Sequence, residues 1–160
     1  MTMHYCPVII YHCIDFRLIK ETMRFIDERY GLGKCDIVSV AGAGKGIADD
    51  EKKVEDIANV NKERIVDDNK NFRCYLLRQA KLSHNLHGSR KVVLIHHSDC
   101  GVYNNCYEFE SGEEEKQKQI EDMKKAEVVI KKLLPDVTVE KVWAQMLDPR
   151  GEKVNFIVVD

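Results

Sequence analysis

The sequence predicts an α/β fold, in which about five strands form a mostly parallel sheet with an antiparallel C-terminal edge strand and helices on both faces. One observation is that short runs, such as Val8 to Tyr11 and Val92 to Ile95, are apolar throughout, as strands buried on both faces are. A second is that longer segments with helical spacing of apolar residues separate these runs. A third is that only a turn, Asp148 to Gly151, separates the last two runs, which favours an antiparallel pair.

The amino-terminal part of the chain is predicted to form a strand, a helix and a second strand. The first strand occupies about residues 7 to 13. We predict a helix from about Leu18 to Tyr30, which Gly31 and Gly33 would end. The prediction rests on apolar residues at spacings of four, three and four: Ile19, Met23, Ile26 and Tyr30. The second strand is Asp36 to Val40.

A glycine-rich loop, Ala41 to Gly46, follows the second strand. Glycines let backbone amides approach an anion, so a phosphate site is one interpretation. However, no Ser or Thr follows Lys45, and the glycine spacing does not match the dinucleotide pattern. A flexible turn at the edge of the sheet explains the loop equally well, and the sequence leaves its role open.

The stretch from Asp49 to Gly88 is polar and predicted to be helical, as suits the long connection between parallel strands. His84 and His87 lie in its last turn, where we interpret them as cations that suit the helix dipole rather than as metal ligands. Apolar residues with helical spacing fall in two segments, first Val54, Ile57 and Ala58, and then Phe72, Leu76, Leu77 and Ala80.

The carboxyl-terminal part is predicted to form a helix from Glu113 to Leu134 and strands at about Val137 to Leu147 and Val154 to Val159. We interpret the charged run from Glu113 to Lys118 as a solvated face. The opposite face carries apolar residues with helical spacing: Ile120, Met123, Ala126, Ile130 and Leu134.

Length and composition bound the class of protein. The chain has 160 residues, which fit a single domain over residues 1–160, and 44% apolar with 32% charged residues is typical of globular proteins. A formal net charge of -2 gives no reason to expect nucleic acid or an anionic membrane as partner. No apolar run approaches the roughly 18 residues of a membrane helix, and residues 1–7 do not resemble a signal peptide. We therefore expect a cytoplasmic protein.

Two short motifs carry the candidate chemistry. Cys13, Asp15 and Arg17 follow the first apolar run, and His97 and Cys100 follow the run that ends at Ile95. Because carboxyl ends of parallel strands meet at one edge of a sheet, we expect both groups to lie together. Two thiolates and one imidazole suit Zn²⁺ and leave a fourth tetrahedral position for water or a carboxylate.

The alternative is that both cysteines are reduced core residues, which are common as small buried hydrophobes. That interpretation does not explain why Asp15, Arg17 and His97 lie beside them. The remaining cysteines are interpreted as plain thiols: Cys6, Cys35, Cys74 and Cys106.

At these residues the sequence resembles the β-class carbonic anhydrases, whose motifs are Cys-x-Asp-x-Arg and His-x-x-Cys-Gly. Every motif position is filled, from Cys13 to Arg17 and from His97 to Gly101. The chain resembles a small, divergent member, because Ser39 and Val40 replace the Arg-Asn that commonly precedes Ala-Gly beside the active site.

The resemblance implies reversible hydration of CO₂ to bicarbonate by a zinc-bound hydroxide, with Cys13, His97 and Cys100 as metal ligands. Asp15, paired with Arg17, would orient the hydroxide, or would bind the metal itself in a resting form. The resemblance also implies a homodimer or higher homo-oligomer. Two alternatives remain open: a hydrolase of carbonyl sulfide or carbon disulfide, and a non-enzymatic zinc protein of the same fold.

Overall fold

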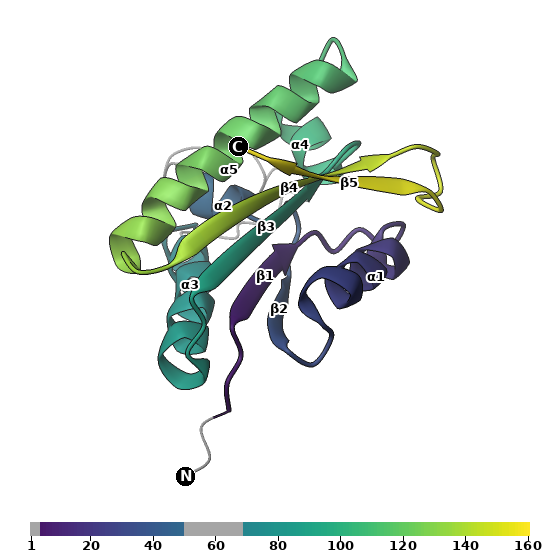
Figure 1. Ribbon diagram of the computed structural model, residues 1–160. Helices are drawn as coiled ribbons and strands as arrows, with labels where there is room; N and C mark the ends of the chain where they lie inside the picture. The colour runs from purple at the N-terminus through teal and green to yellow at the C-terminus, as the bar shows by residue number, and fades with distance from the viewer. Residues whose placement is uncertain (1–3, 50–68) are drawn as a thin grey trace.

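The computed structural model describes residues 4–49 and 69–160, and its organising element is one sheet (Figure 1). The strands occur in the spatial order β2-β1-β3-β4-β5. The first four are parallel to their neighbours, and β4 and β5 are antiparallel, which confirms the predicted fold class. The strands are β1 (Val8–His12), β2 (Cys35–Ser39), β3 (Lys91–His97), β4 (Thr138–Met146) and β5 (Val154–Val159).

The order of the strands determines where a ligand site can form. From β1 the chain moves outward to β2 and then returns to place β3 on the other side of β1. Such a reversal leaves a crevice at the carboxyl ends of the two central strands, where open α/β sheets bind ligands. In the register His12 pairs with Ile95, so Cys13 and His97 emerge at the same edge.

Helices cover both faces of the sheet (Figure 1). On one face, α1 (Ile19–Tyr30) packs Ile26 against the side chains of Ile10 and Val93. The other face carries α2 (Lys45–Ala48), α3 (Asn69–Leu82) and α5 (Gly112–Leu133). Their buried apolar side chains pack on alternate residues of the same strands, including Ile47, Leu76, Met123, Ala126 and Ile130. Strands that are covered by helices on both faces have apolar side chains on both sides. The apolar runs in the sequence therefore predicted the positions of these strands correctly.

Some predictions need correction. Ile19, predicted on the buried face of α1, is exposed. Glu115, within the charged run interpreted as solvated, is 6% exposed and faces the sheet edge. Residues Val54, Ile57 and Ala58 lie outside the described residues.

The structure also adds detail at the helix ends. The helix before β3 ends in a π-helical turn, Ser83–His87. There His84 contacts Asp136 at 3.0 Å and His87 contacts Asp36 at 2.7 Å. A short helix, α4 (Gly101–Cys106), follows the second motif and was not predicted. No helix of the described residues is both long and apolar enough to cross a membrane.

Candidate metal centre

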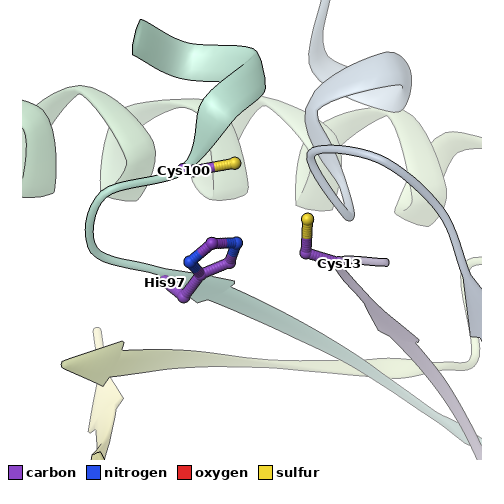
Figure 2. A group of neighbouring side chains, drawn as sticks. All are labelled: Cys13, His97 and Cys100. Carbon is purple, nitrogen blue, oxygen red and sulfur yellow. The ribbon is translucent and has the colours of Figure 1, made fainter. Parts of the chain in front are cut away.

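Three side chains from the two motifs lie together at the carboxyl ends of β1 and β3 (Figure 2). Cys13 follows β1, His97 is the last residue of β3, and Cys100 immediately precedes α4. One ligand atom from each lies within 4.8 Å of the other two. Among the described residues this is the one cluster of at least three such side chains that is compact enough to hold a metal ion.

The imidazole of His97 is oriented for coordination. Its Nδ1 lies 2.9 Å from the carbonyl oxygen of Ser98, and because a carbonyl only accepts, Nδ1 carries the proton. In the neutral ring the other nitrogen, Nε2, therefore has a free lone pair. It is buried, and it is the one buried side-chain nitrogen or oxygen in the described residues that has no hydrogen-bond partner. An unpartnered buried acceptor is costly unless something binds it.

The two sulfurs lie in contrasting environments. A hydrogen bond from Cys100 lowers the pKa of the Cys13 thiol well below its ordinary value, and His97 and the backbone amide of Gly42 act in the same direction. The same contact with Cys13, together with burial, raises the pKa of Cys100. Burial opposes protonation of His97, but its contact with the Cys13 sulfur raises its pKa overall. The pair therefore favours a Cys13 thiolate.

The glycine loop is part of this site. Gly42, with φ of 74°, directs its amide at the Cys13 sulfur. The amide of Gly44 donates to His96 Nε2 at 3.1 Å, and a Cβ built on Gly44 would lie 3.1 Å from that nitrogen. Burial lowers the pKa of His96 to about 4, consistent with a neutral ring that accepts this bond. The loop thus brings its backbone close to protein side chains.

Asp15 and Arg17 form the contact expected of them. Arg17 donates from Nε to Asp15 Oδ1 at 3.0 Å and from a terminal nitrogen to Oδ2 at 2.6 Å. These hydrogen bonds hold the pKa of Asp15 below its ordinary value. Arg17 also donates to the Asp99 carboxylate at 2.7 Å and to the Asp99 carbonyl at 2.9 Å. The guanidinium therefore links the two motifs, and the Asp15 carboxylate lies on Arg17 in this structure rather than in the three-residue cluster.

The donor set fits zinc. Thiolate and imidazole are ligands that Zn²⁺ prefers, and three protein ligands leave the open position found in catalytic rather than closed structural sites. Sequence reasoning did not assign Gly42, Asp99 or Glu115 to the site. Gly42 lies in the glycine-rich loop whose role the sequence left open, and Asp99 lies inside the second motif, but nothing in the sequence singled out Glu115.

A family model described as "Putative carbonic anhydrase" matches residues 57–155, more than half of the chain. The chain belongs to this family. The matched range includes His97 and Cys100, while the first motif precedes it. No curated protein matches the chain.

Solved structures of similar fold include two carbonic anhydrases. That of Streptococcus mutans has 18% identity and a TM-score of 0.50, covering 97% of this chain and 84% of its own. That of Glaciozyma antarctica has 17% identity and a TM-score of 0.53, covering 99% and 86%. An apo carbon disulfide hydrolase has 15% identity and a TM-score of 0.40, covering 88% and 76%. The two carbonic anhydrases show that this chain shares their fold.

Proposed function

We propose that this protein catalyses the reversible hydration of CO₂ to bicarbonate, using a zinc ion held by Cys13, His97 and Cys100. The observation that carries the proposal is the buried, unpartnered Nε2 of His97, in a cluster with both cysteines whose ligand atoms lie within 4.8 Å of one another. Membership of a carbonic anhydrase family supports the same reaction. When bound in such a set, zinc lowers the pKa of a bound water to about 7 and so supplies hydroxide near neutral pH.

Asp15 has the role of orienting the reacting water. Its carboxylate is a charged acceptor two residues from Cys13, and the hydrogen bonds from Arg17 lower its pKa. It would accept a hydrogen bond from the remaining O–H of the nucleophile, whose proton stays on the oxygen, and so direct a lone pair toward CO₂. Arg17 keeps the carboxylate ionised and fixes its plane through two parallel hydrogen bonds.

Replacing Asp15 with Asn tests this assignment. An amide accepts with one oxygen and without charge, and it cannot form the paired contact with Arg17. We expect Asp15→Asn to retain its zinc and its fold but to lose at least about tenfold in CO₂ hydration, or about 1.4 kcal/mol of barrier. Stopped-flow assays with a pH indicator would measure the rate, and elemental analysis the zinc.

Asp36→Asn provides the matched control. Asp36 is also a hydrogen-bonded carboxylate, but it lies near the start of β2, at the opposite end of the sheet. It should keep the parent's rate. Parent-like hydration by Asp15→Asn at every pH would reject the mechanism. A zinc-loaded parent that is inactive on CO₂ would reject the proposed reaction, and assays with carbonyl sulfide would then separate a hydrolase from a non-enzymatic zinc protein.

We also propose that the active unit is at least a dimer. The support is the subunit-interface cleft implied by the resemblance, together with Ile14 and Phe16, which flank Asp15 and are 57% and 85% exposed. Exposed apolar side chains beside a site are typical of surfaces that another chain covers. Light scattering at the assay concentration measures this, and an active monomer would contradict it. Phe16→Asp should weaken the association, with exposed Tyr75→Asp as control.

A further inference from the structure

A buried carboxylate on α5 contacts the loop that carries the second motif. Glu115 lies in the first turn of α5, after the N-cap Ser111, and is 6% exposed. Its Oε2 accepts from the backbone amide of Asp99 at 2.9 Å, and its Oε1 accepts from that of Cys100 at 3.0 Å. Gln119, one turn later, donates to the same Oε1 at 2.9 Å. The carboxylate thus has three donors, and the helix N-terminus favours its charge.

The backbone amides of Asp99 and Cys100 belong to residues that contact different parts of the site. The amide of Cys100 belongs to the residue whose sulfur faces Cys13. The amide of Asp99 belongs to the residue whose side chain and carbonyl bind Arg17. Asp99 has φ of 56°, a left-handed conformation that a non-glycine residue adopts at a cost. A fixed acceptor for its amide is therefore a means of maintaining that backbone conformation.

The same support reaches the third candidate ligand. Gln119 donates from its side-chain nitrogen to the carbonyl oxygen of His97 at 2.8 Å. Together, Glu115 and Gln119 therefore contact the backbone of His97, Asp99 and Cys100. Ser98 is held from β4, since its amide donates to the Ala144 carbonyl at 3.0 Å.

We propose that Glu115 is a positioning residue for the metal centre, whose carboxylate sets the Cys100 sulfur and the Arg17–Asp15 pair relative to His97 by holding the Asp99 and Cys100 amides. This inference rests on the proposed metal site. It does not depend on which substrate the site acts upon.

The test is metal binding by Glu115→Gln. The amide keeps the size of the side chain, but it has a single acceptor oxygen, and its NH₂ group would face one of the two backbone donors. We expect Co²⁺ and Zn²⁺ to bind roughly 10–100-fold more weakly, as when outer partners of metal ligands are removed. Competition with a chromogenic chelator measures the affinity. The thiolate-to-Co²⁺ charge-transfer bands report ligand geometry, and they should shift or weaken.

Two controls separate positioning from general destabilisation. Glu121→Gln makes the same chemical change on an exposed position of α5 and should bind metal like the parent. Met123→Ala opens the core beneath the same helix without touching the loop, so it should lower the melting temperature yet keep the affinity and spectrum at a temperature where it is folded. If Glu115→Gln does not fold, Glu115→Asp retains the charge but withdraws it from the two amides, and the same loss is expected.

Each outcome either supports or overturns the positioning role of Glu115. Weaker binding with an altered spectrum in the Glu115 variant alone supports the inference. Parent-like affinity and spectrum in that variant, or an equal loss in Met123→Ala, overturns it while leaving the metal site intact. If the parent shows no thiolate-to-Co²⁺ bands, the proposed metal site fails, and the inference fails with it.

Discussion

The two ends of the sheet have similar residues but different chemistry. Each end brings together two cysteines, a histidine and an aspartate: Cys13, Cys100, His97 and Asp15 at the carboxyl end, and Cys6, Cys35, His87 and Asp36 at the amino end. The amino-end cluster is nevertheless not among the described groups whose geometry could hold a metal ion.

The difference lies in which backbone groups face the sulfurs. At the amino end, Cys6 donates to the Val8 carbonyl at 3.2 Å and Cys35 to the Gly31 carbonyl at 3.5 Å. Burial is the main cause that raises the pKa of both thiols, and the charge of Asp36 acts in the same direction. Nδ1 of His87 lies 2.7 Å from the Asp36 carboxylate, so this ring nitrogen already has a partner. These thiols are kept protonated and partnered.

At the carboxyl end, backbone amides rather than carbonyl groups face the sulfurs. The backbone amide of Gly42 faces the Cys13 sulfur and helps to lower the pKa of that thiol. The amides of Val102 and Tyr103 face the Cys100 sulfur and oppose the contact with Cys13 and the burial that raise its pKa overall. Parallel strands end where loops and helices begin, and the first amides of a helix have no partner within it. We infer that strand direction, and not residue type alone, makes one cysteine pair a candidate ligand set.

The largest expected effect is on metal content. The double variant Cys13→Ser, Cys100→Ser should fall from one zinc per chain to none, because hydroxyls replace both thiolate ligands. The matched variant Cys6→Ser, Cys35→Ser should keep all of its zinc. Elemental analysis of the purified proteins measures both, with circular dichroism to verify folding. Full zinc in the first variant, or loss of zinc in the second, would reverse the assignment of the two ends.

Much of the carboxyl-end site could be predicted from the sequence. The apolar runs before Cys13 and His97 located two adjacent parallel strands, and strand direction then predicted that the motif side chains share one edge. The pairing of Asp15 with Arg17 was also predicted, and in the structure it is bidentate. These features depend on residue type and local order, which a sequence displays directly.

The supporting contacts could not be predicted, because their partners are backbone groups. Glu115 has the same character as its exposed neighbours Glu113 and Glu114, and only the packing angle of α5 directs it at the amides of Asp99 and Cys100. Helix α4 was missed for a related reason, since six residues are too few to display helical periodicity.

A second carboxylate, Glu140, provides the counterpart of Glu115 at the amino end. It lies near the start of β4 and accepts from Arg29 at 3.1 Å through each oxygen, and from the Tyr30 hydroxyl. Burial acts to raise the pKa of Glu140, but the hydrogen bonds from Arg29 and Tyr30 outweigh it and lower the pKa overall. Its partners are side chains of α1 and, at 3.7 Å, Lys91 of β3, rather than amides of a ligand loop, so we expect a role in stability alone.

The smallest predicted effect follows from Glu140→Gln. A carboxylate whose pKa is lowered by folding stabilises the protein above its unfolded pKa of about 4.3, and the contribution disappears as the pH falls through the folded value. We expect the substitution to lower the free energy of unfolding by about 1 kcal/mol at pH 7, a modest value because Arg29 is partly exposed. The deficit should shrink toward zero at acid pH, while Co²⁺ affinity at pH 7 stays at the parent's value. Urea denaturation across this pH range, with chelator competition on the same samples, measures both. A deficit that persists unchanged at low pH would show that lost packing, and not lost charge, destabilises the variant, and weakened Co²⁺ binding would show that the two ends of the sheet are coupled.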